Sequence, residues 1–391
     1  MTHPDERFIE DPLQVEDLLD EEDRAIGEVV RRFVTSEVIP HVHEWYEAGA
    51  FPRELVKELA AMGLLGMHLE GYGCAGAGPI AYGVACRELE AGDSGLRSFV
   101  SVQGSLSMTA IHAFGSEEQK QQWLPAMAAG EAIGCFGLTE PDVGSNPAGM
   151  RTSARRDGDD WILDGTKLWI TNGTIADVAV VWARTDEGIQ GFLVETDTPG
   201  FSARDIPRKL SLRASYTSEL SLADCRVPDA ARLPGVASLR GPLTCLNEAR
   251  YGIVWGVTGA ARSCYRSAVD YAGSREQFDQ PIAGFQLTQR KLVDMSVELV
   301  KAQLLAVRIG QLKAADRLDP EQLSYGKLNN CRIALDIART ARTIHGANGI
   351  TLDYPVFRHM NNLESVATYE GTEEMHTLSI GRRLTGLAAF S

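Results

Sequence analysis

The stretch DWILDGTKLWITNG, residues 160–173, marks a change in the texture of the sequence. Two short runs rich in β-branched and aromatic residues are separated by Asp-Gly and closed by Asn-Gly, which are typical turn dipeptides. Similar runs follow in VAVVWAR (178–184) and GFLVET (191–196), at roughly ten-residue spacing. This pattern predicts an antiparallel β-barrel or sandwich within residues 131–238.

The segments on both sides of this β-rich region have the periodicity of helices. In PRELVKELAAMGLLG (52–66), apolar residues recur on one helical face before a glycine ends the run. We therefore expect an α+β fold with an N-terminal helical domain (1–130), a β-domain (131–238) and a C-terminal four-helix bundle (239–391). The run 289–312 has the apolar stripe of a long bundle helix, formed by Leu292, Met295, Leu299, Ala302, Ala306 and Ile309.

Composition and charge exclude several classes of protein. The chain has 391 residues, with 53 acidic and 38 basic side chains and a formal net charge of −15. No basic run resembles a nucleic-acid-binding stripe, and no apolar run approaches the roughly 18 residues that cross a bilayer. The acidic N-terminus lacks the apolar core of a signal peptide and the arginines of a transit peptide. We therefore expect no nucleic-acid or membrane partner and a cytoplasmic location of bacterial type, with a processed mitochondrial matrix form left open.

The cysteines and histidines form no pattern that is typical of a metal site. Seven cysteines are scattered without C-x-x-C spacing, and eight histidines form no H-x-x-x-H or H-E-x-x-H pattern. The cysteines therefore predict reduced thiols rather than a disulfide framework or a zinc site. No metal ligands are predicted.

Two glycine-rich stretches lie in different contexts. GYGCAG (71–76) satisfies G-x-G-x-x-G, and Asp93 lies about twenty residues beyond it, as in a dinucleotide fingerprint. The sequence that follows offers no second strand for a βαβ unit, so a helix end followed by a turn is the favoured interpretation. CFGLTEPDVGSNPAGM (135–150) can present N–H and hydroxyl groups to a polar ring edge or a phosphate. It can equally be a linker between domains.

The segment KLWITNG (167–173) is a further candidate for contact with a flat ring. Strand alternation would place Trp169 and Thr171 on one face and Ile170 on the other. An indole and a hydroxyl on one face can pack against a heterocycle and hydrogen-bond to it. A plain half-buried strand is the alternative.

The acidic run YEGTEE (369–374) contains one glutamate that a helix start does not explain. Thr372 as an N-cap, followed by Glu373 and Glu374, predicts the first turn of a helix. Glu370 lies before that cap. From the residues alone it is either a surplus acid stabilised by the helix dipole or a base directed at a substrate.

Taken in order, five motifs resemble those of the acyl-CoA dehydrogenase family of flavoproteins. They span nearly the whole chain, and the helical–β–helical order expected above agrees with the fold of that family. Within the family, RELEAGDSGLRSFVSVQGSL (87–106) and RHMNNLESVATYEGT (358–372) most resemble the glutaryl-CoA dehydrogenase branch. The five motifs are FGLTEPDVGS (136–145), WITNG (169–173), SREQF followed by FQ (274–286), IHGANG (344–349) and YEGTEE (369–374).

The resemblance implies FAD as the cofactor and names its contacts. FAD contacts that cross between subunits would make the protein a homotetramer. The loop lining the flavin would be Phe136, Gly137, Leu138, Thr139, Glu140, Pro141, Asp142, Val143, Gly144 and Ser145, and the cover over its ring would be Trp169, Ile170 and Thr171. Contacts from a neighbouring subunit would be Arg275, Gln286, Thr343, Ile344, His345, Gly346 and Ala347, and contacts at the helix start would be Thr372, Glu373 and Glu374.

The resemblance also implies the chemistry and the substrate contacts. Glu370 would remove the α-proton while hydride leaves the β-carbon for the flavin, and the electrons would pass to an electron-transfer flavoprotein. Arg97, with Ser98 beside it, would hold the distal carboxylate of glutaryl-CoA. Glu90 would orient Arg97 if the segment between them is helical. Further substrate contacts would be Ser145, Leu243, Thr244, Cys245, Leu246, Asn247, Glu248, Ala249, Arg250, Gly371 and Phe390.

The expected products are crotonyl-CoA and CO2, because the dehydrogenated intermediate is poised to lose its terminal carboxylate. The presence of Tyr369, Thr171 and Glu90 favours decarboxylation. The alternatives are a non-decarboxylating glutaryl-CoA dehydrogenase, another short-chain acyl-CoA dehydrogenase, and a flavin-free acyl-CoA-binding protein with the same fold.

Overall fold

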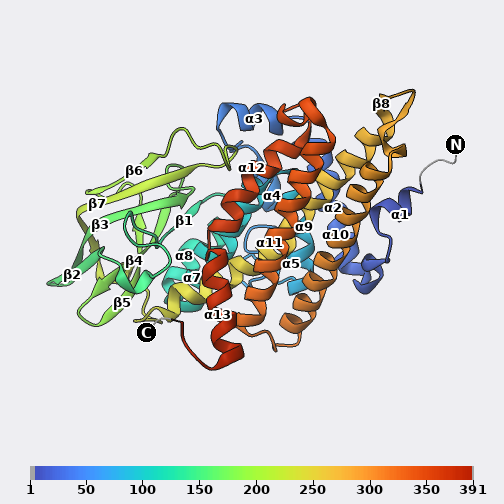
Figure 1. Ribbon diagram of the computed structural model, residues 1–391. Coiled ribbons are helices and arrows are strands. Elements are labelled where there is room, and N and C mark those ends of the chain that lie inside the picture. The colour runs from blue at the N-terminus through green and yellow to red at the C-terminus, as the bar shows by residue number, and fades with distance from the viewer. Residues whose placement is uncertain (1–4, 390–391) are drawn as a thin grey trace.

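The computed structural model describes residues 5–389 as helices, then a β-sheet, then further helices (Figure 1). Among the described residues, no strand precedes residue 134. GYGCAG (71–76) therefore lies in a turn between helices rather than in a strand–turn–helix fingerprint. The N-terminal helices are α1 (Glu6–Glu10), α2 (Glu21–Phe33), α3 (Val42–Ala48), α4 (Leu55–Ala61), α5 (Pro79–Gly92), α6 (Ser94–Ser101), α7 (Thr109–Phe114) and α8 (Glu117–Ala128), with π-helical turns at Val34–Val38 and Val102–Met108 and a 3-10 turn at Val15–Leu18.

The middle part is a seven-stranded sheet with the order β1-β4-β2-β3-β7-β6, and β5 pairs with the other side of β4. β4 runs parallel to β1 and makes one parallel bridge to β2, while the remaining pairs are antiparallel. The predicted closed antiparallel barrel is therefore wrong in two respects, because the sheet is mixed and it curls only into a half-barrel. The strands are β1 (Gly134–Gly137), β2 (Ser153–Asp157), β3 (Asp160–Thr171), β4 (Val178–Thr185), β5 (Gly188–Glu195), β6 (Phe201–Asp205) and β7 (Thr217–Pro228).

The sheet needs no closure because helices cover one of its faces. Ile111 from α7 and Leu124 from α8 share one buried apolar cluster with Val180 and Trp182 from β4. Residues of the opposite face, such as Val181, pack inside the curl of the sheet. The runs expected on the two sides of Asp164-Gly165 form one strand, β3. The spacing of β-rich runs along the sequence therefore predicts that a sheet exists, but neither where each strand ends nor which face is covered by helices.

The C-terminal part contains five α-helices instead of the four expected. The last two, α12 and α13, both pack on α11 and follow one another in Figure 1, so the predicted fourth helix is divided in two. The break lies at residues 369–372. The helices are α9 (Arg240–Ser274), α10 (Gln286–Ala314), α11 (Pro320–Ile344), α12 (Pro355–Thr368) and α13 (Glu373–Thr385), with a short hairpin of β8 (Glu276–Gln277) and β9 (Gln280–Pro281) after α9.

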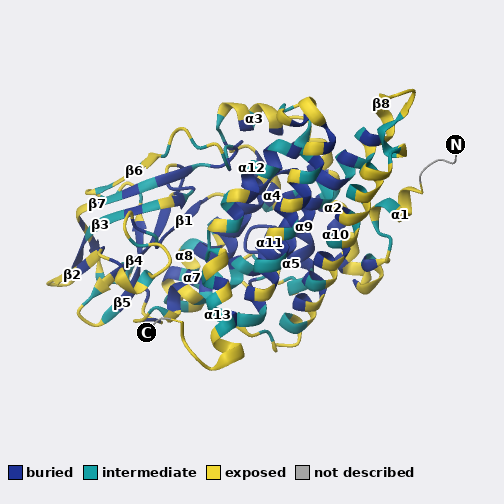
Figure 2. Ribbon diagram, in the orientation of Figure 1, coloured by how far each residue is buried: buried dark blue, intermediate teal, exposed yellow. Residues whose placement is uncertain are grey.

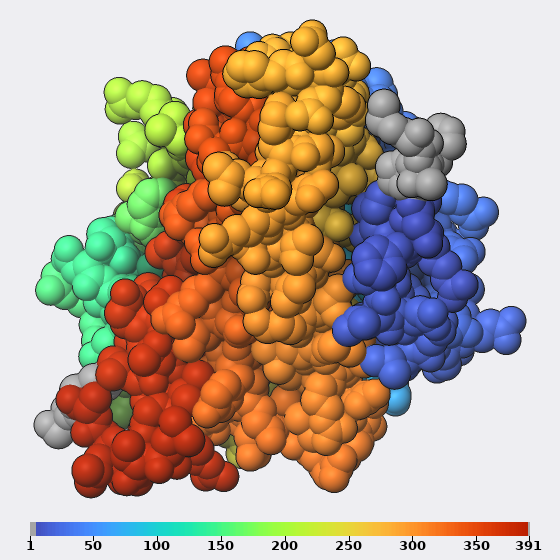
Figure 3. All heavy atoms as spheres, turned by 45° about the vertical axis from the view of Figure 1, so that its right-hand side comes forward, coloured from blue at the N-terminus to red at the C-terminus, as the bar shows by residue number. Residues whose placement is uncertain are grey.

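The N- and C-terminal helices share a core. Tyr82 from α5 packs in one buried cluster with Tyr251 and Trp255 from α9 and with Val307 from α10, and Figure 2 shows α5 and α9 dark blue along this contact. Figure 3 shows the C-terminal helices in the middle of one face, between the N-terminal segment and the β-sheet. None of the helices described combines the length and the apolar character that a bilayer crossing requires.

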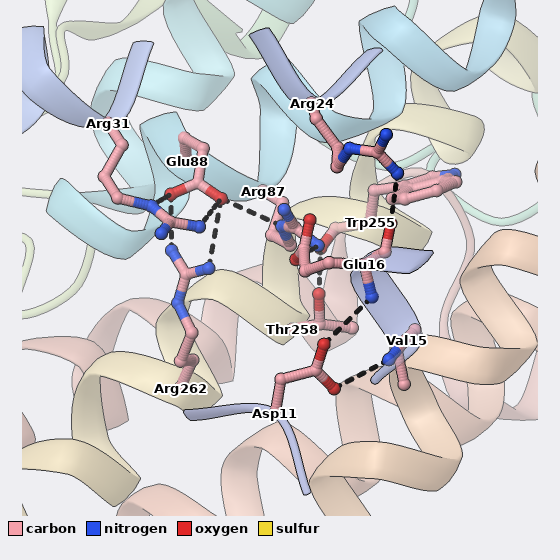
Figure 4. Close-up of polar contacts among 10 residues, drawn as sticks. All are labelled: Asp11, Val15, Glu16, Arg24, Arg31, Arg87, Glu88, Trp255, Thr258 and Arg262. Carbon is pink, nitrogen blue, oxygen red and sulfur yellow. Dashed lines mark hydrogen bonds and ion pairs between the residues drawn. The ribbon is translucent and has the colours of Figure 1, made fainter. Parts of the chain in front are cut away.

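A buried ion cluster joins α2, α5 and α9 (Figure 4). The Glu88 carboxylate of α5 is 1% exposed. It accepts hydrogen bonds from Arg31 at 3.0 Å, Arg87 at 2.9 Å and Arg262 at 3.0 Å, and Arg87 also pairs with Glu16 at 2.7 Å. Burial alone would raise the pKa of Glu88, but Arg262, Arg87 and Arg31 hold that pKa well below its usual range.

Removal of the Glu88 charge is expected to destabilise the fold. Glu88→Gln leaves three arginines around a neutral amide, which costs about 3–5 kcal/mol in the free energy of unfolding. Because the pKa of Glu88 is depressed in the folded state, its stabilisation is present above the unfolded pKa of about 4.3 and is lost as the pH falls further. Urea unfolding at a series of pH values measures both effects, and the variant should lose less stability than the wild type on acidification.

Glu298→Gln is the matched control, since Glu298 forms an exposed pair with Lys301 at 2.6 Å on α10. This change should have little effect on unfolding. Equal losses in the two variants would show that the Glu88 cluster does not stabilise the fold more than a surface pair does.

Candidate active site

The break between α12 and α13 has an unusual backbone. Glu370 has φ of +54° and Gly371 has φ of +104°, so both lie outside the helical region. Thr372 caps α13 by accepting a hydrogen bond from the Met375 N–H at 3.4 Å. Glu373 pairs with Arg332 on the surface, and Glu374 is exposed. The helix start predicted from the sequence is confirmed, and it leaves Glu370 outside the helix in a left-handed conformation.

The Glu370 side chain has the surroundings of a base. Its Oε2 atom is buried and has no hydrogen-bond partner among the described residues. Burial raises the pKa of Glu370 above its ordinary value, against the opposing effect of Arg97, Arg250 and Lys327. The Arg250 Nε donates to the Glu370 backbone carbonyl at 2.7 Å rather than to the carboxylate. The carboxylate is therefore left available for a substrate proton.

Arg97 and Ser98 meet the same segment through Tyr369. Arg97 is 1% exposed and donates to the Tyr369 hydroxyl, and the Ser98 hydroxyl lies 3.2 Å from that oxygen. The Arg97 Nε binds Glu90 Oε2 at 2.6 Å. A guanidinium has five N–H donors, and the Arg97 Nη1 atom has no protein partner within residues 5–389.

Glu90 and Arg97 pair across a helix boundary. The expected pairing was conditional on a helical segment between them, but that segment is not one helix, because α5 ends at Gly92 and α6 begins at Ser94. The ion pair forms nevertheless, and α9 passes beside it with Gly256. A side chain at Gly256 would collide with Glu90 Oε2. The absence of a Cβ at that position is what allows the pair to lie against α9.

The loop of residues 136–145 is joined to the strand that carries Trp169. The Leu168 N–H donates to the Thr139 carbonyl at 2.8 Å. The strand register shifts between Lys167 and Ile170, and Trp169 takes φ of +64° with 58% of its surface exposed. The regular alternation predicted for this segment is therefore interrupted by a bulge, which directs a strained and exposed tryptophan outward.

Glu140 holds the base of this loop. Its carboxylate pairs with the Lys167 ammonium at 2.8 Å and accepts the N–H groups of Arg151 and Thr152 at 2.6 and 2.9 Å. Burial opposes ionisation of Glu140, but the bonds from Lys167 and Thr152 lower its pKa to about 2. The Glu140 side chain is thus occupied within the protein. The Thr139, Ser145 and Thr171 hydroxyls, by contrast, have no hydrogen-bond partner among the described residues.

Only one face of the predicted run 243–250 can meet a substrate. Leu243, Asn247 and Arg250 recur on one side of α9 and are at least partly exposed. Cys245 and Ala249 lie on the opposite side, fully buried in the core. The helical period therefore turns the side chains of Cys245 and Ala249 away from the face that could meet a substrate.

The contacts predicted for a neighbouring subunit lie together at the far side of the molecule from the sheet (Figure 1). Arg275 and Gln286 flank the exposed β8–β9 hairpin, and Thr343, Gly346 and Ala347 are exposed at the end of α11. Ile344 is buried in the helical core. Phe390 lies outside the described residues.

His345 is occupied inside the protein. Its Nδ1 atom lies 2.8 Å from the Ala341 carbonyl, its Nε2 atom lies 3.0 Å from the Ser267 hydroxyl, and its ring stacks on Tyr271 at 4.5 Å. The residue is 1% exposed. Both ring nitrogens of His345 therefore already have partners, so its side chain is not free to contact a cofactor.

Three residues at the site were not selected from the sequence. Lys327 and His376 are buried beside Gly371, and Gly256 lies beside Glu90. For Lys327 a signal existed, because a lysine falls on the same helical stripe as Leu323 and other buried residues of α11. Nothing in the local sequence marks Gly256 or His376.

Comparison with known proteins agrees with this arrangement over nearly the whole chain. The acyl-CoA dehydrogenase N-terminal, middle and C-terminal domain models match residues 20–131, 135–225 and 240–385. The human mitochondrial short-chain specific acyl-CoA dehydrogenase is 36% identical over 374 residues, which cover 94% of this chain and 90% of that protein. The chain belongs to the acyl-CoA dehydrogenase family.

Two solved structures are more similar still. A glutaryl-CoA dehydrogenase of Mycobacterium smegmatis is 65% identical, with a TM-score of 0.97 and coverage of 98% of this chain and 99% of that chain. A glutaryl-CoA dehydrogenase of the same organism in complex with FADH2 is 61% identical, again with a TM-score of 0.97 and coverage of 98% and 99%. The cofactor of this protein, as a member of the family, is FAD. The exposed Trp169 ring and the unpartnered Thr139 and Thr171 hydroxyls suit a flat heterocycle with polar edges.

The backbone at Gly371 gives a testable prediction. Gly371→Ala should slow reduction of the flavin by an acyl-CoA, because an added Cβ would lie 2.9 Å from His376 Nε2 and the φ of +104° disfavours a side chain. The strain should also lower the free energy of unfolding by about 1–3 kcal/mol. Stopped-flow absorbance of the bound flavin and urea unfolding give the two measurements.

Gly381→Ala is the control for this change. Gly381 lies in α13, and a Cβ added there meets no atom within 4 Å. Reduction of the flavin should be unaffected. If the two variants reduced equally fast, the backbone at Gly371 would have no part in the site.

Proposed function

We propose that this protein is an FAD-dependent dehydrogenase of glutaryl-CoA that also releases CO2, with Glu370 as the base. The observation that carries the proposal is the joint placement of two groups. A buried carboxylate with a raised pKa and a buried guanidinium are linked by one residue, Tyr369, which precedes Glu370 in the chain and accepts a hydrogen bond from Arg97. The similarity to two glutaryl-CoA dehydrogenases supports the same substrate.

The charges around Glu370 favour a substrate with a second carboxylate. Arg97, Arg250 and Lys327 are the cations that act on Glu370. Only Glu90 and Glu370 itself offset them, so one positive charge is left uncompensated when Glu370 is ionised. A distal carboxylate would neutralise that charge with charge-assisted hydrogen bonds from the Arg97 guanidinium. A purely apolar acyl tail would leave the charge buried and uncompensated, which is costly.

Each protein group has a definite task in the proposed reaction. The Glu370 carboxylate takes the proton from the α-carbon of the thioester. The Gly371 N–H donates to the thioester oxygen, which stabilises the negative charge that develops there. Trp169 and the hydroxyls of Thr139 and Thr171 would hold the FAD ring. When bound, FAD supplies the acceptor for the hydride that leaves the β-carbon.

Decarboxylation follows from the product of dehydrogenation. Once the double bond has formed, the bond to the distal carboxylate can break, and its electron pair is delocalised toward the thioester carbonyl as CO2 leaves. Protonation of the remaining carbon chain gives crotonyl-CoA. Glu370 then carries the proton removed earlier and is available to return it.

The proposal includes two protein partners. The exposed residues at the far end of the bundle, Arg275 and Gln286 among them, would contact the FAD of a neighbouring copy in a homotetramer. An electron-transfer flavoprotein would reoxidise the reduced enzyme. The second candidate function is a non-decarboxylating glutaryl-CoA or other short-chain acyl-CoA dehydrogenase, which is supported by the 36% identity to the short-chain specific enzyme.

The direct test is anaerobic addition of glutaryl-CoA to the purified yellow protein. The flavin absorbance should bleach, and after turnover with an artificial acceptor, mass spectrometry should detect crotonyl-CoA and CO2. Glu370→Gln should retain bound FAD but slow the reduction by about 100- to 10,000-fold, since it removes the general base. Accumulation of glutaconyl-CoA without CO2 would favour the non-decarboxylating function instead.

Arg97→Met tests the choice of substrate. Reduction by glutaryl-CoA should slow about 10- to 100-fold more than reduction by butyryl-CoA, because about 1.5–3 kcal/mol of charged hydrogen bonding is lost only for the dicarboxylic substrate. Arg87→Met is the matched control, since Arg87 is also a buried arginine of the N-terminal helices but binds Glu88 and Glu16. Its ratio of the two rates should equal that of the wild type, and an unchanged ratio in Arg97→Met would contradict the carboxylate-binding role.

A further inference from the structure

Lys327 is a buried cation that the reaction proposed above does not use. It lies on α11 with 1% of its surface exposed. Its ammonium donates to the Gly371 carbonyl at 2.9 Å and to the Ala367 carbonyl at 3.4 Å. These two carbonyls lie on opposite sides of Glu370 in the chain, one in the last turn of α12 and the other in the break.

The break creates the need for such a donor. The last carbonyls of a helix have no partner within the helix, and a buried carbonyl without a hydrogen bond is costly. Lys327 approaches from α11, and Arg250 approaches from α9 to bind the Glu370 carbonyl at 2.7 Å. Three carbonyls around the base are thus held by two cations from two different helices.

We propose that Lys327 is a positioning residue whose ammonium, by binding the Ala367 and Gly371 carbonyls, fixes the backbone that carries the Glu370 carboxylate and the Gly371 N–H. This inference rests on the proposed role of Glu370 as the base. Lys327 itself exchanges no proton with the substrate in this scheme. It keeps the base and the oxyanion donor in one geometry, and a shift of about 1 Å there can slow a reaction roughly 100-fold.

The charge of Lys327 has a second effect that a merely structural contact would not have. The cations facing Glu370 are Arg97 from α6, Arg250 from α9 and Lys327 from α11. On α13, burial together with Lys327 and Arg250 lowers the pKa of His376 to about 3, so this residue is neutral at physiological pH.

Two further groups near Lys327 carry no charge at physiological pH. Burial raises the pKa of Tyr369, which lies in the break after α12, and it raises the pKa of Cys331 from α11 to about 11. Removal of Lys327 therefore leaves two cations facing Glu370, and the pKa of Glu370 should rise further.

The experiment compares Lys327→Met with Lys209→Met in the full-length, FAD-loaded protein. Lys209 is a matched control, because its ammonium also binds two backbone carbonyls, those of Leu212 at 2.7 Å and Ser215 at 2.6 Å. It also resembles Lys327 in that burial lowers its pKa, here to about 8. Hydrogen exchange followed by mass spectrometry reports on residues 367–376, and acyl-CoA-driven reduction of the flavin is measured across a pH series.

Lys327→Met should speed hydrogen exchange in residues 367–376 and slow the maximal reduction rate about 10- to 100-fold, with little change in the KM for the acyl-CoA. The acid limb of the pH–rate profile should move upward by about one unit, since a base with a higher pKa needs a higher pH to ionise. Lys209→Met should leave both the exchange of this segment and the acid limb at their wild-type values.

A second variant keeps the test decisive if Lys327→Met does not fold. Lys327→Gln removes the charge but keeps an NH2 group that can donate to a backbone carbonyl. It should therefore shift the acid limb, but speed hydrogen exchange less than Lys327→Met does. Wild-type exchange in residues 367–376 together with a wild-type acid limb, in either folded variant, would overturn the proposal. If no acyl-CoA reduces the wild-type flavin, the proposed function fails, and the exchange measurement alone still decides whether Lys327 holds the segment.

Discussion

Two helices that meet end to end around left-handed residues release backbone carbonyls that a protein interior cannot leave without donors. In this protein that constraint lies at residues 369–372, between α12 and α13. The hydrogen-bond donors for these carbonyls are two cationic side chains, Arg250 from α9 and Lys327 from α11. The groups that complete the backbone hydrogen bonding are therefore also the groups that set the electrostatic field at Glu370.

Two opposing effects act on Glu370, the proposed base. Burial alone would favour the protonated form of Glu370, and the three cations alone would favour the ionised form. The pKa of this carboxylate stays raised because Arg250 binds the Glu370 carbonyl and Lys327 binds neighbouring carbonyls, so neither cation pairs with the Glu370 side chain. Arg97, in turn, is already paired with Glu90. A base that made a direct salt bridge would be ionised but weak. The observed arrangement keeps the base close to cations without a direct bond to any of them.

The sequence predicted the elements more reliably than their partners. The apolar stripe of α10 and the Thr372 cap depend on residues close in the chain, and both predictions are confirmed. Closure of the barrel was predicted wrongly, because it depends on which helices cover the sheet. Cys245 and Ala249 were included among the substrate contacts although their side chains are buried, since a motif transferred as a continuous run ignores the helical period.

The site residues, too, were predicted where the signal is local and missed where it depends on distant partners. Glu370 could be separated from Glu373 and Glu374 by the capping pattern, but its function could not be decided from the residues alone. The Glu90–Arg97 pair was anticipated by seven-residue spacing, although the helix breaks between the two residues. Lys327 was missed because its partners are carbonyl groups, and the sequence does not show which carbonyls a break in a helix will release.

One structural device recurs at three strained positions of the chain. Lys327 binds carbonyls beside Glu370, Lys167 binds the Leu138 carbonyl in the loop beside the Trp169 bulge, and Lys209 binds the carbonyl of Leu212, which has φ of +49°. An ammonium has three donors and no acceptor, so one lysine can join carbonyls from segments that helix and sheet bonding leave apart. A strained residue persists where its surroundings fix it, and a lysine that joins several carbonyls is one way to do so.

The burial and partners of the side chain at each of these strained positions show whether the strain serves packing or a function. Leu212 is 7% exposed and fills the core, so its strain serves packing alone. Trp169 instead exposes most of an aromatic ring, and Glu370 buries a carboxylate oxygen without a partner. Neither arrangement gains anything from the folded chain by itself, since an exposed indole and an unpartnered buried oxygen are both unfavourable. Both would become favourable with the FAD ring on the indole and a substrate proton at the carboxylate, which is the physical reason to propose the chemistry at these two residues.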